Sequence, residues 1–397
     1  MEKIELLAPA GDLERLKVAF LYGADAVYIG GKDFNLRSNA INFTLDEIKE
    51  ACDFAHKLNK KVYLTLNIFF HNEDTENIEA YIKNVVDCKI DAFIVSDPYI
   101  ISYIKGNYPS VEVHLSTQNS TTNYKAVEYF KEEKVDRVVL ARELSKEEIK
   151  EIIDKTKLDI EVFIHGAMCT CLSGRCALSN YVTRRDANRG GCAQVCRFSL
   201  ETPEKKDFTM ASKDLNMTIH IKDLIEIGVK SLKIEGRMRS LYYIATVVST
   251  YRKIIDSYYE KSLTVEKIEE YNKRLKMVSN RASSTHFFTK EANKDDQYFT
   301  GRNEFSNQDY LGLVIDYDKD NKCIILKERN YFELNDIVEI FTPDFKFYEY
   351  TVEKIFDENM NELQVARHPE QVLKLPFSKE IPKYSMIRML RKTSCQK

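Results

Sequence analysis

Residues Ile4–Gly31 read IELLAPAGDLERLKVAFLYGADAVYIGG and set a pattern that recurs along the first two thirds of the chain. Ile4–Ala8 is a short apolar run that predicts a strand, and Leu13–Gly23 has helical periodicity and stops at a glycine. Ala26–Ile29 predicts the next strand. Further strands, mostly with helices between them, are predicted at Val62–Asn67, Ala92–Val95, Val111–Leu115, Arg137–Leu140, Glu161–Ile164 and Ser231–Ile234.

Eight short strands separated by helices predict an α/β fold, a (β/α)8 barrel of the TIM type over residues 1–290. A doubly wound open sheet is the main alternative, because the number of strands does not show whether a sheet closes. In a barrel the chemistry gathers at the carboxyl ends of the strands, so we expect the active site at that mouth. The polar residues predicted there are Asn67, Asp97, Gln118, Glu143, His165 and Glu235.

The last quarter of the chain has a different character. Residues 291–309 predict a linker, and residues 310–397 predict a small β-barrel-like C-terminal domain. Aromatic residues recur in it and fit the stacking of nucleobases, although aromatics at alternate strand positions more often form a core. The strands of this domain are predicted at Tyr310–Asp316, Cys323–Lys327, Asp336–Phe341, Phe347–Lys354 and Ser385–Leu390.

Composition narrows the class of protein. The 397 residues are 44% hydrophobic and 30% charged, which is typical of a globular protein. The formal net charge of -3 gives no overall basic field for nucleic acid, so any such binding needs a local patch. No stretch approaches the roughly 20 apolar residues of a membrane span, and the first residues do not resemble a signal peptide. We therefore expect a cytoplasmic protein that does not enter a membrane.

Cysteines are concentrated in residues 165–197, directly after the seventh predicted strand. Five of the nine cysteines lie there. Disulfides suit small secreted domains, so a four-cysteine metal centre is favoured, with a redox-active dithiol or unrelated buried cysteines as alternatives. An iron–sulfur cluster tolerates varied spacing, whereas zinc usually takes two short CxxC-like pairs. The four candidate ligands are Cys169, Cys176, Cys192 and Cys196, and Cys171 is a spare thiol or an alternative ligand.

Cationic residues lie near the carboxyl ends of the seventh and eighth predicted strands. Arg189 and Arg197 lie within or beside the cysteine stretch, and Lys233 and Arg237 end the eighth predicted strand. If both groups face the mouth, they form a pocket for a phosphate or carboxylate ligand; a solvated charged loop is the alternative. Glu235 among these cations is a candidate orienting group or base. The candidate acid–base histidines are His114 and His165.

Several of these motifs together resemble the peptidase U32 family. The resemblance rests on Glu161-x-Phe163-x-x-Gly166-Ala167-Met168-Cys169 and Gly174-x-Cys176-x-Leu178-Ser179, with further likeness in Glu5–Gly11, Asn188–Arg197 and Ser231–Arg237. The family name implies a collagenase-like protease. Other branches carry an iron–sulfur cluster on four cysteines and hydroxylate a nucleobase or a quinone precursor.

The layout most resembles the branch that hydroxylates tRNA uridine at carbon 5, which is associated with prephenate as hydroxyl source. This likeness implies Cys169, Cys176, Cys192 and Cys196 as ligands of an iron–sulfur cluster, of the 4Fe-4S type by family pattern, with zinc as the alternative. Arg189, Arg197 and Arg237 become the candidate contacts to a dicarboxylate, and tRNA the expected partner. A U32 collagenase-like peptidase and a metal-braced RNA-binding accessory protein remain the alternative functions.

One segment departs from the family pattern. In Asn280–Phe288, Ala282 and His286 stand where family members often carry glycine. A loop that needs a positive φ is therefore not expected there.

Overall fold

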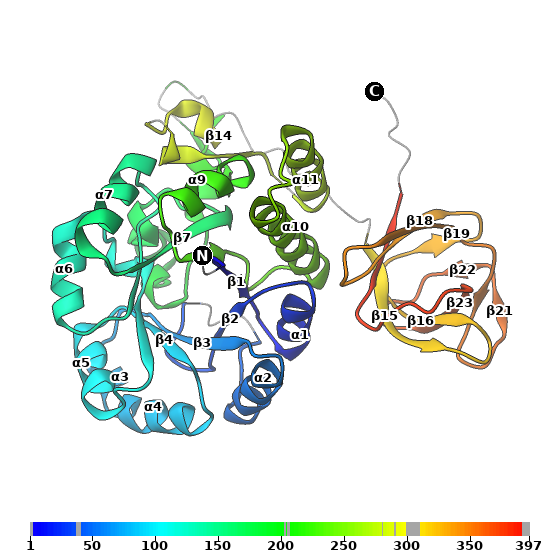
Figure 1. The fold of residues 1–397 in the computed structure, drawn as a ribbon, viewed down its shortest axis with the longest axis horizontal. Coiled ribbons are helices and arrows are strands. Elements are labelled where there is room, and N and C mark those ends of the chain that lie inside the picture. Colours follow the sequence, from blue (N-terminus) through cyan, green and yellow to red (C-terminus); the bar gives the residue numbers. More distant parts are fainter. Residues whose placement is uncertain are drawn as a thin grey trace. The chain divides into compact units, whose positions relative to one another are not determined.

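The computed structural model describes residues 3–36, 41–201, 204, 207–279, 281–289, 291–298 and 310–390. The chain divides into two compact units (Figure 1), residues 1–276 with 281–304 and residues 277–280 with 305–397.

The first unit is a closed parallel barrel. Its strands follow the order β12-β1-β2-β3-β4-β5-β6-β7, and β12 also pairs with β7. The register joins Glu5 to Ser231 and Ser231 to Glu161 across the closing strands. This pairing confirms the (β/α)8 prediction and excludes the open sheet. The strands are β1 Glu5–Pro9, β2 Ala26–Gly30, β3 Lys61–Leu66, β4 Ala92–Val95, β5 Glu112–Leu115, β6 Arg137–Val139, β7 Asp159–Gly166 and β12 Ser231–Ile234.

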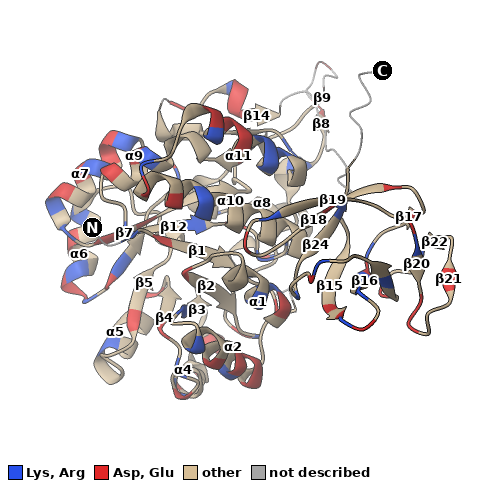
Figure 2. Cartoon of the chain, turned by 45° about the vertical axis from the view of Figure 1, so that its right-hand side comes forward, with Lys and Arg blue, Asp and Glu red and all other residues tan. Residues whose placement is uncertain are grey.

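Helices surround the strands (Figure 1). Side chains fix where several of them begin: Thr44 and Ser145 each form a capping box at a helix start. Charges of both signs alternate on the outer faces of α6 and α7 (Figure 2), as expected for solvated surfaces. The helices are α1 Leu13–Leu21, α2 Leu45–Lys57, α3 Asn72–Thr75, α4 Ile78–Asp87, α5 Pro98–Asn107, α6 Tyr124–Glu132, α7 Lys146–Thr156, α9 Ile221–Glu226, α10 Leu241–Tyr259 and α11 Val265–Val278.

The barrel interior holds both apolar and charged side chains. Leu7, Ala26, Tyr28, Tyr63, Ala92 and Ile94 form one apolar cluster. Arg137 contacts Glu5 at 2.6 Å and Glu161 at 3.2 Å, and Lys233 contacts Glu161 at 2.7 Å. Buried charges are tolerated when each is paired and hydrogen-bonded.

Between β7 and β12 the chain makes a long excursion that carries the cysteines. It contains the short helices η2 Leu172–Gly174, α8 Leu178–Thr183, η3 Ala187–Arg189 and η4 Val195–Arg197. It returns as β11 Asp214–Asn216, which pairs antiparallel with the end of β7. After β11 the chain forms α9 Ile221–Glu226, which leads into β12.

Part of the predicted linker is ordered on the barrel unit. Asn293 and Asp296 form a capping box at η7 Lys294–Asp296. The following strand β14 Gln297–Tyr298 pairs with β10 Ala211–Ser212. Residues 299–309 of the linker lie outside the described residues.

The segment that departs from the family pattern does contain a left-handed residue. His286 has φ +48°, in the region that favours glycine. Its Nε2 lies 2.9 Å from the Lys213 carbonyl, and its backbone N–H donates to Ser284 Oγ at 3.1 Å. These contacts hold the geometry without glycine.

The second unit is an antiparallel half-barrel with the order β19-β18-β24-β15-β16-β23-β20-β21. Buried Leu311, Val314, Ile324, Val338 and Ile387 belong to its core. The predicted strands are present, and the sequence reasoning missed β20, β21 and β23 of this sheet. The strands of this sheet are β15 Tyr310–Asp318, β16 Cys323–Glu328, β18 Ile337–Phe341, β19 Phe347–Thr351, β20 Ile355–Phe356, β21 Glu362–Leu363, β23 Val372–Pro376 and β24 Met386–Met389.

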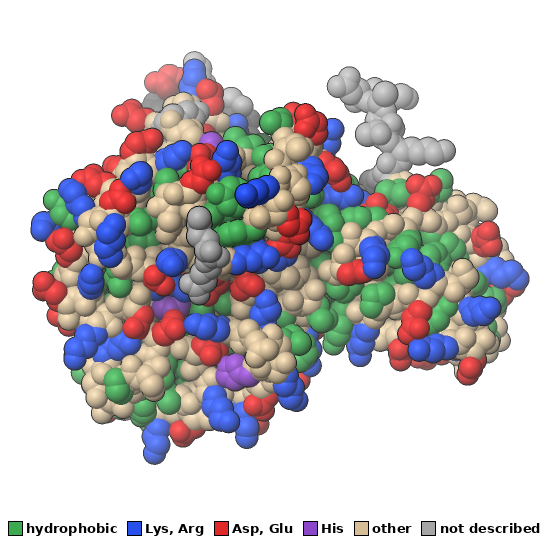
Figure 3. Space-filling view, in the orientation of Figure 1, with side chains coloured by type: hydrophobic (Ala, Val, Ile, Leu, Met, Phe, Trp, Pro, Cys, Tyr) green, Lys and Arg blue, Asp and Glu red, His purple; other side chains and the backbone are tan. Residues whose placement is uncertain are grey.

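The surface has no dominant sign of charge on the face that Figure 3 shows, where acidic and basic side chains are interspersed. Among the described residues, no helix combines the length and the apolar character that crossing a membrane requires.

Candidate functional site

The cysteine excursion starts at the barrel mouth, against Glu235. Gly166 ends β7 with φ +110°, and a Cβ there would lie 2.6 Å from the Glu235 carbonyl oxygen. The Glu235 backbone N–H donates to the His165 carbonyl at 2.9 Å. The turn therefore needs glycine and brings the first cysteine to the carboxyl end of the strands.

The thiols of the excursion influence one another electrostatically. Burial raises the pKa of Cys169, and the neighbouring Cys176 and Cys192 raise it further. Burial also raises the pKa of Cys196, with contributions from Cys169, Cys192 and Cys176. Burial, a hydrogen bond to Cys176 and the charge of Cys169 raise the pKa of Cys171 to about 12. All five thiols are free, and each is coupled electrostatically to at least one of the others.

Polar side chains tie the two halves of the cluster together. The Cys176 backbone N–H donates to Asn188 Oδ1 at 3.2 Å, and Asn188 Nδ2 donates back to the Cys176 carbonyl at 3.0 Å. The Ala193 N–H donates to Ser179 Oγ at 3.2 Å. The Leu178 N–H donates to Cys176 Sγ at 3.3 Å, the type of bond that tunes a metal-bound thiolate.

The donor set fits a four-thiolate cofactor in its chemistry. Soft thiolates select zinc or iron–sulfur clusters. Within the part of the chain that the structure describes, no three His, Cys, Asp or Glu side chains converge on one point as ligands of a single ion do. The ligands of a cluster bind separate irons, so this set needs no common point. The iron–sulfur cluster remains a prediction, with zinc as the alternative.

Arg142 connects the thiol cluster to Glu235, and the sequence reasoning missed it. Its Nη1 donates to the Ala167 carbonyl at 2.6 Å, and its guanidinium lies 3.8 Å from the centre of the Phe163 ring. Burial lowers the pKa of Arg142, opposed by Glu235 and Cys169 among its neighbours. The only signal was its place after the sixth predicted strand, where we had singled out Glu143.

Glu143 positions the cysteine excursion. Its Oε1 accepts the Ser173 N–H at 2.9 Å, and Oε2 lies 3.4 Å from Ser173 Oγ. Ser173 has φ +49°, a backbone conformation that costs free energy outside glycine. The carboxylate therefore helps to hold a strained turn between Cys171 and Cys176.

Glu235 and Arg237 both lie at the mouth. The Tyr28 hydroxyl donates to Glu235 Oε2 at 3.1 Å. Arg237 is 4% exposed, and its guanidinium donates to Asn35 Oδ1 at 2.7 Å and to Thr65 Oγ1 at 3.3 Å. A Cβ at Gly30 would lie 1.9 Å from Arg237 Nη1, so this glycine makes room for the cation.

The other predicted anion contacts are placed differently. Arg189 donates to both carboxylate oxygens of Asp74 and to the Phe69 carbonyl, which ties the excursion to the loop after β3. Lys233 lies inside the barrel on Glu161. Arg197 is half-buried and donates to Gln194 Oε1 at 2.5 Å. Lys233 Nζ also lies 4.7 Å from the centre of the Tyr28 ring, whose hydroxyl donates to Glu235.

The two predicted histidines are buried. His165 Nδ1 lies 3.1 Å from the Tyr251 hydroxyl of α10, and burial, with Arg239, lowers its pKa to about 3. His114 Nε2 lies 3.0 Å from Glu112 Oε2, and burial lowers its pKa. Burial thus favours the neutral form of both imidazoles, and His165 faces the helix layer.

Two amide side chains at the mouth have oxygen atoms that no described group satisfies. Gln118 is 6% exposed and its Oε1 is buried without a hydrogen-bond partner, as is Asn67 Oδ1. Gln118 Nε2 would lie 3.7 Å from a Cβ at Gly174, which places it beside the cysteine excursion. Buried acceptors of this kind suit a ligand that donates a hydrogen bond.

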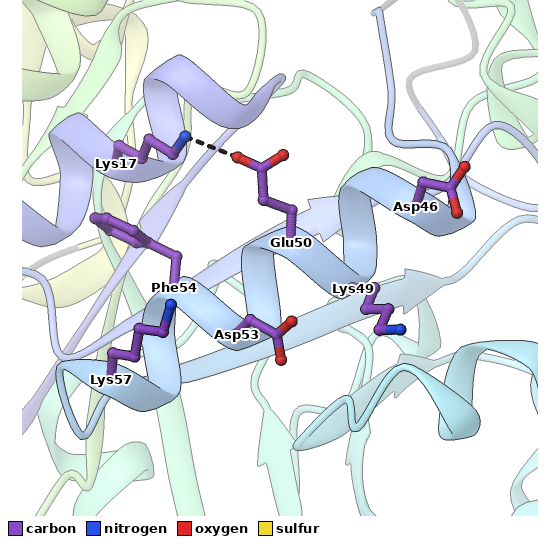
Figure 4. Close-up of a pocket in the computed structure, with 7 residues that line it drawn as sticks. All are labelled: Lys17, Asp46, Lys49, Glu50, Asp53, Phe54 and Lys57. Carbon is purple, nitrogen blue, oxygen red and sulfur yellow. Dashed lines mark hydrogen bonds and ion pairs between the residues drawn. The ribbon is translucent and has the colours of Figure 1, made fainter.

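A hollow of about 460 Å³ lies elsewhere, between α1 and α2 (Figure 4). Lys17 Nζ and Glu50 Oε1 are 2.8 Å apart there. None of its lining residues belongs to the excursion or the strand ends, and the charges balance. They are Lys17, Asp46, Lys49, Glu50, Asp53, Phe54 and Lys57.

The chain combines a closed parallel barrel, which carries a cysteine excursion at its mouth, with a separate antiparallel half-barrel. This combination defines the class of protein. The chain belongs to peptidase family U32. The family's sequence model matches residues 11–298, and that of the family's C-terminal domain matches residues 306–388.

Curated relatives cover nearly the whole chain. The tRNA hydroxylation protein P1 of Bacillus subtilis is 47% identical over 98% of this chain and 95% of its own length. The tRNA hydroxylation protein P of Escherichia coli is 30% identical over 96% of this chain and 95% of its own. A collagenase of Porphyromonas gingivalis is 34% identical over 70% of this chain and 71% of its own.

Proposed function

We propose that this chain is a tRNA modification enzyme that hydroxylates carbon 5 of the wobble uridine. The observation that carries the proposal is the 47% identity, over 98% of this chain, to a tRNA hydroxylation protein. A tRNA substrate also accounts for the expected cytoplasmic location.

The proposed cofactor is an iron–sulfur cluster on Cys169, Cys176, Cys192 and Cys196. When bound, it would supply electron transfer at the barrel mouth. The Leu178 backbone N–H donates a hydrogen bond to Cys176 Sγ, and Arg142 lies near Cys169. Each favours the thiolate of its cysteine, because each stabilises negative charge on sulfur.

The mouth residues bind and orient the reactants in this proposal. Arg237 presents a buried guanidinium that suits a carboxylate of a hydroxyl donor such as prephenate. Glu235, oriented by Tyr28, accepts the proton that carbon 5 loses. Gln118 and Asn67 offer acceptors for the N–H of the uracil ring.

The test is gain of a modified nucleoside. The chain is expressed in a bacterial host that lacks its own tRNA hydroxylation proteins, and digested tRNA is analysed by mass spectrometry. We expect uridine to gain one oxygen at the wobble position. Unmodified tRNA, with the chain expressed and loaded with iron, would contradict the proposal.

A peptidase is the second candidate, favoured by the collagenase relative. Purified protein is incubated with denatured collagen, beside a Cys192→Ser variant as control. Cleavage by the wild type, absent from the variant, would favour this candidate. Tight tRNA binding with neither reaction would instead favour an accessory RNA-binding protein.

A further inference from the structure

The excursion presents aromatic and aliphatic side chains to solvent. Tyr181 on α8 is 86% exposed, more than any other large hydrophobic side chain that the structure describes. Val182 is 55% exposed and Phe198 is 46% exposed. Phe198 directly follows η4, which packs against α8. An exposed aromatic patch of this kind marks an interaction surface rather than a core.

The same surface is basic. From Cys169 to Phe198 the sequence contains five arginines and a single acid, Asp186. Arg184 and Arg185 are exposed, and no interaction with a carboxylate is found for either among the described residues. Arg175 is also exposed, and its guanidinium lies 5.1 Å from the centre of the Phe69 ring. The local charge thus opposes the net charge of the whole chain.

A second exposed aromatic residue shows that exposure alone does not identify a surface that binds nucleic acid. Tyr129 on α6 is 53% exposed, but it lies in a segment with Glu128, Glu132 and Glu133. In the excursion, by contrast, exposed rings occur together with arginines for which no carboxylate partner is found among the described residues. Rings that stack on bases and cations that contact phosphates are the two features of surfaces that bind single-stranded nucleic acid.

We propose that Tyr181, Phe198, Arg184 and Arg185 form a platform that holds a single-stranded loop of RNA, with an unpaired base stacked on Tyr181. The identity of the RNA as substrate rests on the proposed function. Tyr181 lies on α8, whose first residue, Leu178, donates its backbone N–H to Cys176 Sγ at 3.3 Å, so a base held there lies near the thiol cluster.

The platform can be tested by binding. Full-length protein, purified anaerobically with its cofactor, is titrated into a fluorescently labelled RNA hairpin with an unpaired loop and into a fully paired duplex. We expect Tyr181→Ala to weaken hairpin binding by about 5- to 100-fold, the loss of one stacked base, and Tyr181→Phe to retain it. Tyr129→Ala is the matched control and leaves the affinity unchanged.

The arginines are tested by salt dependence. The double variant Arg184→Ala/Arg185→Ala should lower the slope of log affinity against log salt by about 1.4, because two phosphate contacts are lost. Unchanged circular dichroism and iron content show that the variants fold and load. Variants that bind the hairpin as the wild type does would overturn the platform.

Two further results separate the platform from the proposed function. Wild-type hydroxylation of tRNA, together with normal binding and turnover by Tyr181→Ala, overturns the platform and leaves the function standing. Wild-type hairpin binding that Tyr181→Ala abolishes, without any hydroxylation, supports the platform and overturns the function. A shift from dimer to monomer in Tyr181→Ala, with hairpin binding unchanged, assigns the surface to a second copy of the chain.

Discussion

The interior and the mouth of the barrel are built from the same strands but differ in whether their buried polar groups have hydrogen-bond or ion-pair partners. Inside, Glu161 contacts both Lys233 and Arg137. At the mouth, the oxygens of Gln118 and Asn67 are buried without partners. Nε of Arg137 and Nδ1 of His114 are exceptions in the interior. Paired charges stabilise the barrel, whereas unpaired acceptors cost stability and are retained where a ligand satisfies them.

The largest expected effect is on the thiol cluster. Cys192→Ser removes one thiolate, and we expect it to lose bound iron and all hydroxylation, because serine is a poor ligand for iron in a cluster. Iron and sulfide are measured after anaerobic purification. Cys171→Ser should keep the iron, as should the control Cys88→Ser on α4. Full iron in Cys192→Ser would remove this residue from the ligands.

Substitutions in the barrel interior should change the stability of the protein rather than its activity. Glu161→Gln leaves Lys233 and Arg137 without this carboxylate, and we expect the free energy of unfolding to fall by about 3–5 kcal/mol. Urea titrations followed by circular dichroism measure it. The control Glu128→Gln removes an exposed pair with Lys125 and should cost less than about 0.5 kcal/mol. Equal losses in the two variants would contradict the difference between interior and surface.

The Glu161 carboxylate also makes the stability of the protein depend on pH. Burial alone would raise the pKa of Glu161, but Lys233 and Arg137 lower it to about 2. In the unfolded chain it is about 4.3. The stabilisation is therefore present above about pH 4.3 and is lost as pH falls toward 2. Between these values the wild type should lose more stability than Glu161→Gln.

Arg237→Lys should reduce turnover and leave the fold intact. The guanidinium donates to Asn35 and Thr65 at once, which a lysine cannot reproduce in the same geometry. We expect kcat/KM for hydroxylation to fall by about 10- to 100-fold with iron content unchanged. Normal kinetics would take Arg237 out of the site.

The smallest expected effect is that of Gln118→Met, which should change stability and substrate binding in opposite directions. Gln118→Met keeps the volume but removes the buried unpartnered oxygen, so the free energy of unfolding should rise by about 1 kcal/mol. The KM for tRNA should rise by about tenfold, because the base loses an acceptor. A less stable variant with unchanged KM would make Gln118 a structural residue.

Local periodicity was enough to predict most of the barrel. The helix predicted over Leu13–Gly23 is observed as Leu13–Leu21, and the strand predicted at Ala92–Val95 has the observed bounds, since apolar spacing and caps are encoded within each segment. Closure depends on β12 pairing with β7, a contact between distant segments, and the sequence left it open. The strand Asp214–Asn216 was missed because its partner Gly166–His165 lies about 50 residues away.

The candidate site was predictable to a similar extent. The density of cysteines and their place after a strand end were visible in the sequence. The ion-pair partners of the cations could not be predicted from the sequence. Arg189 pairs with Asp74, 115 residues away in the sequence, and Lys233 pairs with Glu161, 72 residues away. Arg142 was missed for the same reason: its importance comes from contacts with distant Ala167 and Glu235.

The cysteine excursion leaves and rejoins the barrel at one place, where Gly166 faces Leu215 and His165 faces Asn216. The eight barrel strands close without it, since β12 pairs directly with β7. The thiols therefore lie outside the strands that close the barrel. Loss of a thiol should remove the metal centre while the eight-stranded sheet stays closed.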